Sequence, residues 1–312
     1  MQASAAPSSR RSAAVAALLK PAARIAVVAP AGIPDRDLLD KGMALLSEWG
    51  YEVVPGRHLL ASHRYNGGTV QQRVLDLNWA LTSEDVQAVW LARGGYGCVH
   101  CLPHLSATLP KSRVLVGNSD ATSLLSALHG RGHTHLIHGP MLESLATRVD
   151  DETRGSMQEF LRTSDAPGLR VNQVGGPKSD LVEGTLVGGN LTVLASVAGT
   201  PWAPRQTQGI VMLEDVGEAA YRMDRCMMQL IAGGVLTGAR AVVFGEFTRC
   251  TVPRNADYAI VDIMRDLLQP LNIPVFAGAE FGHGSRNLPW IYGRAAFIEN
   301  GAIKYGRSGR HP

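Results

Sequence analysis

Three residues of the kinds that form a hydrolytic triad each follow an apolar run in this sequence. Ser119 follows "RVLVGN", Glu214 follows "GIVML", and His283 lies between two glycines after "PVFAGAEF". A serine hydroxyl becomes a nucleophile when a histidine accepts its proton and an acid orients that histidine. Nucleophilic acyl transfer, with the triad in the chain order Ser, Glu, His, is therefore the first hypothesis.

Ser119 also has a plainer interpretation. Asn118, Ser119 or Asp120 could cap the helix that follows, because their side-chain oxygens accept backbone N–H groups at helix starts. The alternative is a nucleophile on a tight strand-to-helix turn, with small residues on both sides and the hydroxyl exposed at the end of a parallel strand.

The acid and the histidine have plain interpretations too. Glu214 or Asp215 could cap a helix near residue 219 or pair with Arg222 or Arg225. A carboxylate that ends a buried strand needs a partner, however, and an imidazole could supply it. His283 could be a surface-loop histidine, although its flanking glycines allow a sharp turn that leaves the ring uncrowded.

The order of predicted elements shows where these residues would meet. Strand-like runs alternate steadily with helical periods in the first half, which is typical of parallel βαβ units with helices on both faces. The predicted strands span 24–31, 51–56, 86–97, 113–119 and 135–140, and the predicted helices span 35–50, 70–83 and 120–132. Ligands bind at the carboxyl ends of such strands, where Ser119 and the Gly94-Gly95 pair lie.

A composition shift divides the chain. Residues 1–23 are predicted to be a disordered extension, 24–163 an α/β domain with the nucleophile, 164–180 a linker, and 181–312 a smaller β-rich mixed α/β domain with the acid and the histidine. Helices are expected at 219–232 and 255–268. The "ENGA" segment at 299–302 predicts a two-residue hairpin turn.

Bulk properties exclude several classes of protein. A net charge of +3, without a dense basic stripe, argues against nucleic-acid binding. No apolar run approaches the roughly 18 residues of a membrane helix. The "AAVAALL" stretch near the N-terminus is shorter than the core of a secretory signal and has no convincing cleavage site. A poor signal peptide is the minority interpretation, and we expect a cytoplasmic protein.

Two clusters invite a metal hypothesis, and neither has suitable spacing. Cys98 and Cys101 form a "CVHC" motif, but the other two cysteines, Cys226 and Cys250, make no second pair at zinc spacing. We expect buried thiols. His133 and His135 match no zinc motif, and His138, at a predicted strand end, could line a pocket without doing chemistry. No metal or cofactor is expected.

Backbone N–H groups near Ser119 could stabilise an oxyanion. The candidates are the glycine turn "RGGYG" at 93–97 and the amide of Asp120 at a helix N-terminus. A dinucleotide-binding site does not fit, because the first strand ends in "APAGIPD" rather than G-x-G-x-x-G and no acid ends the second strand.

The ordered motifs resemble those of a known family. They are "RGGYG" at 93–97, "VGNSDATSLLSAL" at 116–128, "HGPM" at 138–141, "GTLVGGNLTVLASVAGTP" at 184–201, "LEDVGEAAYRMDR" at 213–225 and "FGHGSRNLPWIYG" at 281–293. Over about residues 24–305 the chain resembles the L,D-carboxypeptidases of murein recycling, which are serine peptidases. Asn118 stands where that family often has an aromatic residue, and Cys98 where a serine is frequent.

The resemblance implies a site and an activity. It assigns Ser119 as nucleophile, His283 as general base and then acid, and Glu214 as the residue that orients it. It places the oxyanion hole at the amides of Asp120 and the Gly94-Gly95 turn. The implied fold is a flavodoxin-like domain, related to class I glutamine amidotransferases, followed by a smaller β-rich domain, commonly in a homodimer.

The implied reaction is metal-free release of the terminal D-Ala from a murein tetrapeptide, at the bond to the L-centre of diaminopimelate. Arg93 or Arg222 is expected to hold the terminal carboxylate, because the guanidinium fork suits it. A rival within the family hydrolyses peptide-nucleotide antibiotics of the microcin C type by stacking the base on aromatics. The 163–180 region has none, and Trp202 and Trp290 are the nearest substitutes. A rival of another class is a non-catalytic binding protein, which would be expected to lack part of the triad.

Overall fold

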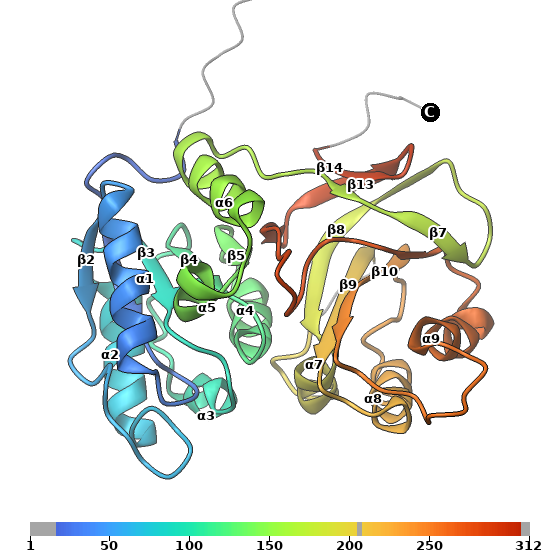
Figure 1. The fold of residues 1–312 in the computed structure, drawn as a ribbon, viewed down its shortest axis with the longest axis horizontal. Helices are drawn as coiled ribbons and strands as arrows, with labels where there is room; N and C mark the ends of the chain where they lie inside the picture. Colours follow the sequence, from blue (N-terminus) through green and yellow to red (C-terminus); the bar gives the residue numbers. More distant parts are fainter. Residues whose placement is uncertain (1–16, 205–207, 307–312) are drawn as a thin grey trace, which may run out of the picture.

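The computed structural model describes residues 17–204 and 208–306. Two β-sheets lie beside one another with helices packed against them (Figure 1). The first sheet is built mainly from the first half of the chain and the second from the second half. No helix within the two described ranges has the length and apolar character needed to cross a membrane.

The first sheet has five parallel strands in the order β2-β1-β3-β4-β5, which is the flavodoxin-like order. Its strands are β1 (Arg24–Val28), β2 (Glu52–Pro55), β3 (Ala88–Leu91), β4 (Val114–Gly117) and β5 (Leu136–His138). The predicted parallel sheet is confirmed.

Helices cover both faces of this sheet, because successive side chains along a strand point to opposite sides. Ile25 and Val27 belong to a core with α1, α5 and α6, whereas Ala26 and Val28 belong to a core with α2 and α4. The helices of this half are α1 (Arg36–Glu48), α2 (Val70–Thr82), α3 (Cys98–Cys101), η1 (Leu102–His104), α4 (Ala121–Gly130), α5 (Leu142–Thr147) and α6 (Asp151–Thr163).

The second sheet is mixed. Its order is β6-β14-β13-β8-β9-β10-β11-β7, with β8 to β11 parallel and the outer strands antiparallel. The strands are β6 (Leu169–Arg170), β7 (Asn172–Gly175), β8 (Leu181–Asn190), β9 (Gly209–Val216), β10 (Ala241–Thr248), β11 (Val275–Ala277), β13 (Ala295–Glu299) and β14 (Ala302–Tyr305). Its helices are α7 (Leu191–Val197), α8 (Ala220–Ala232), α9 (Ile260–Leu268) and η2 (Gln269–Leu271).

The hairpin predicted from "ENGA" is present. Strands β13 and β14 pair antiparallel across Asn300 and Gly301, whose φ angles of 51° and 71° are both positive. Two successive positive φ angles are what a type I′ turn requires, and Asn-Gly is the pair that adopts them most readily. Helix α9, in contrast, begins at Ile260 and not at residue 255.

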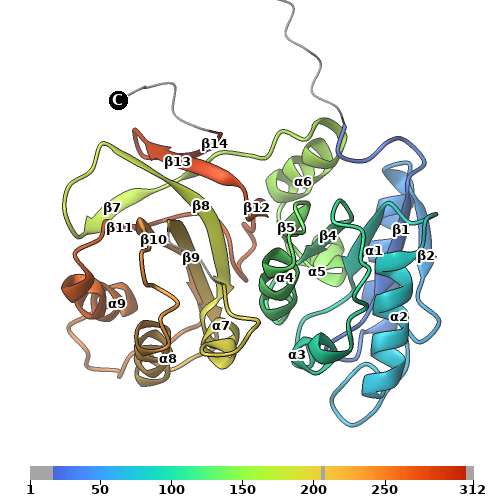
Figure 2. The same cartoon turned by 180° about the vertical axis from the view of Figure 1, so that it is seen from behind.

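The chain crosses the predicted domain boundaries in three places. Strands β6 and β7 lie within the segment 164–180 and belong to the second sheet. Strand β12 (Trp290–Tyr292) leaves the second half and pairs antiparallel with β5 at the edge of the first sheet (Figure 2). Residues 1–16 of the expected extension lie outside the described residues, but Leu19 is buried and its amide donates to the carbonyl of Leu161.

Candidate active site

Ser119 lies on a strained turn between β4 and α4. Its φ angle is +56°, a left-handed conformation that is uncommon for a residue with a side chain. The turn needs small neighbours, since a Cβ on Gly117 would lie 3.0 Å from Cβ of Ala121. Such a strand–turn–helix places the serine hydroxyl above the carboxyl end of the strand.

The helix-cap interpretation does not describe this turn. Asp120 is the N-cap of α4, but its side chain makes no capping hydrogen bond. Oδ2 of Asp120 instead accepts the amide of Cys98 at 2.7 Å, from the segment after β3. The carboxylate next to Ser119 therefore binds the neighbouring loop and not its own helix.

The glycine turn after β3 faces the serine. A Cβ on Gly94 would lie 3.0 Å from Oγ of Ser119, so only a glycine leaves the hydroxyl free at that position. The turn is seated on the loop after β1, where the amide of Gly32 donates to the carbonyl of Gly94 at 3.0 Å. Gly95 has a φ angle of +108°, which glycine adopts without a steric penalty.

Glu214 and His283 form a close pair. Nδ1 of His283 lies 2.6 Å from Oε2 of Glu214, whose side chain is fully buried, while the side chain of His283 is 11% exposed. The adjacent carboxylate points elsewhere: Asp215 accepts from the side chain of Asn190 and from the amide and hydroxyl of Thr192 at the start of α7. Strand β9 thus ends in one acid that faces the histidine and one that fixes a helix.

This pairing shifts the pKa of both groups. Burial lowers the pKa of His283, but the charge and hydrogen bond of Glu214 outweigh burial and leave that pKa above its ordinary value. Burial raises the pKa of Glu214, and the interaction with His283 opposes that rise. An acid that stabilises an imidazolium is the arrangement a general base needs when it takes a proton from a hydroxyl.

The loop that carries His283 is held from both halves of the chain. Asn118, the residue before Ser119, donates from Nδ2 to the carbonyl of Gly282 at 3.1 Å, and Asn287 accepts the amide of Gly282. Arg286 forms an ion pair with Asp150 at the start of α6. These contacts fix the position of the histidine relative to the serine turn.

Ser119 and His283 line one cavity of about 560 Å³ at the carboxyl ends of the first sheet's strands. The hydrogen bonds of the described residues include none between Oγ of Ser119 and His283, and such bonds are often loose before a substrate is bound. Arg93, Arg148 and Arg249 also line this cavity, together with two acids, Asp35 and Glu143.

The two arginines predicted to bind the substrate carboxylate lie in different places. Arg93 lines the cavity. Arg222 does not: it lies on α8, 3.6 Å from Glu218 and in contact with the Tyr221 hydroxyl. Its guanidinium is already paired with Glu218, which lies just before that helix.

His138 is also absent from the cavity lining, because β12 covers it. The ring stacks on Trp290 at 4.9 Å and meets Phe281 edge-on. Burial, aided by the nearby His283, lowers the pKa of His138 to about 3, so it is a neutral buried ring. Sequence reasoning overlooked Arg148 and Arg249 because α5 and the end of β10 carry no motif that signals a ligand.

The cysteines and the other histidines form no metal site within the described residues. Cys98 and Cys101 are fully buried free thiols, and burial raises the pKa of each. Cys226 and Cys250 are free as well and half-buried.

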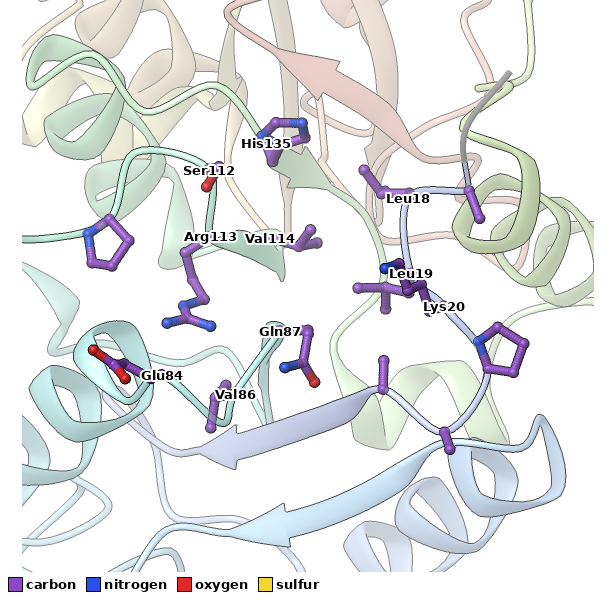
Figure 3. Close-up of a pocket in the computed structure, with 15 residues that line it drawn as sticks. Leu18, Leu19, Lys20, Glu84, Val86, Gln87, Ser112, Arg113, Val114 and His135 are labelled. Carbon is purple, nitrogen blue, oxygen red and sulfur yellow. The ribbon is translucent and has the colours of Figure 1, made fainter. Parts of the chain in front are cut away.

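A second cavity, of about 620 Å³, lies at the amino ends of the first sheet's strands, opposite to Ser119 (Figure 3). Its lining residues precede or begin the strands, and they include Lys20, Gln87, Ser112, Arg113 and His135. Nδ1 of His135 lies 3.0 Å from the hydroxyl of Thr134, and no hydrogen bond joins it to Ser112 among the described side chains. Ser119 and His283 line the cavity at the other ends of these strands, and Glu214 contacts His283.

Comparison with known proteins identifies the family to which this chain belongs. Residues 25–139 match the family model of the LD-carboxypeptidase N-terminal domain, and residues 183–298 match that of the C-terminal domain. The chain is 37% identical to a murein tetrapeptide carboxypeptidase of Pseudomonas aeruginosa over 90% of this chain and 95% of that protein. It belongs to the LD-carboxypeptidase family, as its motifs predicted.

Solved structures agree with the fold. The crystal structure of a muramoyltetrapeptide carboxypeptidase from Oxalobacter formigenes matches with a TM-score of 0.81 and 32% identity, over 91% of this chain and all of that one. The structure of MccF in complex with glutamyl sulfamoyl guanosine matches with a TM-score of 0.83 over 95% of this chain and 99% of that one, at only 20% identity, which supports the fold alone. The microcin C7 self-immunity protein MccF of Escherichia coli is 23% identical over 82% of this chain and 83% of that protein.

Proposed function

We propose that the protein is a cytoplasmic serine L,D-carboxypeptidase that releases the terminal D-Ala from murein tetrapeptides. The observation that carries this proposal is the 2.6 Å contact between Glu214 and His283, a histidine that lines one cavity together with a serine on a strained turn. Membership of the LD-carboxypeptidase family and 37% identity to a murein tetrapeptide carboxypeptidase support the choice of substrate.

The mechanism has two stages. His283 removes the proton of Ser119 as Oγ attacks the carbonyl of the scissile bond, and Glu214 stabilises the imidazolium that forms. The amides of Asp120 and of the Gly94-Gly95 turn hold the negative charge of the tetrahedral intermediate. His283 then gives its proton to the leaving amine of D-Ala, and a water molecule hydrolyses the acyl-enzyme by the reverse sequence of proton transfers.

A carboxypeptidase must also bind a free carboxylate. Arg93, Arg148 and Arg249 are the arginines that line the cavity, and each can form the paired N–H contacts that a carboxylate accepts. Arg93 already donates to the carbonyl of Ile33, which fixes one side of its guanidinium. We assign the terminal carboxylate of the substrate to this set.

The nucleotide-peptide alternative needs an aromatic surface for the base. The cavity lining contains no Phe, Tyr or Trp among the described residues. Trp290 is fully buried beside His138, and Trp202 is half-buried and outside the lining. These positions favour a peptide. A non-catalytic binding protein is disfavoured because Ser119, Glu214 and His283 are all retained.

The test is release of D-Ala from purified murein tetrapeptide, with and without a chelator. We expect release by the wild type that the chelator leaves unchanged, and loss of release in Ser119→Ala. Ser112→Ala, which removes a hydroxyl from the second cavity, is the matched control and should keep full activity. A folded wild type that releases no D-Ala would contradict the proposal, and an aminoacyl-nucleotide would be the next substrate.

A further inference from the structure

Arg73, on helix α2, is a buried cation whose role the mechanism above does not explain. Its side chain is 3% exposed, and Nη1 donates to the carbonyls of Pro30 at 2.6 Å and Gly97 at 2.7 Å, while Nε donates to the carbonyl of Gly68 at 3.3 Å. Burying a guanidinium is costly unless such acceptors replace water. The three acceptors come from three different loops, so a single side chain ties those loops together.

One of these bonds reaches the chain directly after the glycine turn. The carbonyl of Gly97 accepts from Arg73, and the amide of Cys98, in the same peptide group, donates to Oδ2 of Asp120 at 2.7 Å. This peptide group is therefore held between a buried cation and a buried carboxylate. Gly97 has a φ angle of +140°, and a Cβ there would lie 2.4 Å from Nη1 of Arg73, so the close approach requires glycine.

We call Arg73 and Asp120, on either side of the peptide group between Gly97 and Cys98, the clamp. Its carboxylate side is also buried. Asp120 is 2% exposed, and burial raises the pKa of its carboxyl above the ordinary value, a rise that the amide of Cys98 and the charge of Arg73 oppose only in part. Hydrogen bonds made by a guanidinium or a carboxylate are stronger than neutral ones, and one of each holds this peptide group. Asn66 adds a further bond to the same segment, from Nδ2 to the carbonyl of Tyr96.

We propose that Arg73 is a positioning residue that fixes the oxyanion-binding glycine turn relative to the nucleophile. The clamp joins the end of the turn, at Gly97, to Asp120, which follows Ser119 in the chain. A shift of the turn would move the amides near Gly94 away from the oxygen on which charge develops. This role rests on the proposed acyl-transfer function, but the clamp itself can be tested without a substrate.

Arg113 provides a matched control for a purely structural role. It is also a buried arginine, 9% exposed, that donates to two backbone carbonyls, those of Leu81 and Ser83. It lies at the second cavity, at the amino ends of the strands, whereas Ser119 lies at their carboxyl ends. Loss of either guanidinium should lower thermal stability, whereas only loss of Arg73 should affect the turn.

The experiment compares Arg73→Met and Arg73→Lys with Arg113→Met and Arg113→Lys. Hydrogen–deuterium exchange reports the mobility of amides 93–101 without any substrate, and kcat and KM for D-Ala release report catalysis. We expect Arg73→Met to speed exchange in this segment and to lower kcat by about 10- to 100-fold with KM changed far less, as loss of transition-state contacts predicts. Arg73→Lys should recover part of kcat, because an ammonium keeps the charge but cannot reach all three carbonyls.

The proposal is overturned if exchange at 93–101 and kcat in the Arg73 variants match those of the wild type or of the Arg113 variants. If Arg73→Met does not fold, Arg73→Lys decides: wild-type exchange and kcat in that variant would overturn the role. A wild type that releases no D-Ala would count against the proposed function only, because the exchange comparison still tests the clamp.

Discussion

Adding one methyl group at Gly94 tests whether the glycine turn must remain open to the nucleophile. In Gly94→Ala the new Cβ would lie 3.0 Å from Oγ and 3.1 Å from Cβ of Ser119, with Cε of Met141 at 3.9 Å. Ordinary contacts between such atoms are about 3.5–4.0 Å, so the first two contacts are too short by roughly half an ångström. The serine cannot retreat easily, because its own backbone is held at a φ of +56°.

The methyl group also occupies space needed by the reacting carbonyl. A substrate carbon must approach Oγ to about 3–3.5 Å, and a displacement near 1 Å costs about 100-fold in rate. That loss corresponds to about 2.7 kcal/mol of transition-state stabilisation. The φ of Gly94, unlike that of Gly95, is not in the left-handed region, so we expect the free energy of unfolding to change by less than about 1 kcal/mol.

The assay combines kcat and KM for D-Ala release with thermal unfolding. Gly155→Ala, in α6, is the matched control, because its Cβ would meet nothing within 4 Å and should leave kcat unchanged. Gly95→Ala, at a φ of +108°, should lose stability as well as activity. A stable Gly94→Ala enzyme whose kcat stays within about threefold of the wild type would refute the assignment of this turn to the oxyanion site.

Two further predictions follow from the charges of the site. Because the pKa of His283 is raised and the base must be neutral, kcat/KM should rise with pH through a pKa above the ordinary value near 6.5. Glu214→Gln removes the charge that raises it, so in a pH–rate profile that limb should move to lower pH while kcat falls by about 10³- to 10⁴-fold; an unmoved limb would contradict the pairing. Arg148→Gln and Arg249→Gln should raise KM for the peptide, whereas Arg222→Gln, on α8, should leave it unchanged. If the Arg148→Gln and Arg249→Gln variants had the same KM as Arg222→Gln, the cavity arginines would not be carboxylate ligands.

The fold could be predicted to the extent that local pattern determines it. Strands β1 to β5 are apolar runs, the helices α1, α2 and α4 between them have clear periodicity, and the Asn300-Gly301 turn has a specific backbone requirement. Strand β12 escaped prediction because it has three residues, too few to show a period, and its partner β5 is about 150 residues away in the sequence. Pairing at such separation leaves no local signal.

The same limit explains what was right and wrong at the site. Ends of buried strands pointed to the region that holds Ser119, because parallel strands present their carboxyl ends at one edge. The same rule put His138 at a pocket, but the antiparallel partner Trp290 covers that ring. Asn118 was noticed as a possible helix cap and as a departure from the family pattern, but its bond to the carbonyl of Gly282 joins residues 164 positions apart.

The way the two halves join has a consequence for catalysis. One hydrophobic core runs from β1 and α4 of the first half into β8, β9 and α8 of the second, so the two sheets share buried surface and do not meet across a hydrated hinge. Strand β12 follows the histidine loop directly and ends in the first sheet, while Asn118 and Asp150 of the first half bind Gly282 and Arg286 of that loop. Interdomain motion requires an interface that can part, and a shared core with a strand exchanged across it resists parting. The histidine is therefore held near the serine before substrate arrives, and substrate binding has only to bring Ser119 and His283 into hydrogen-bond contact.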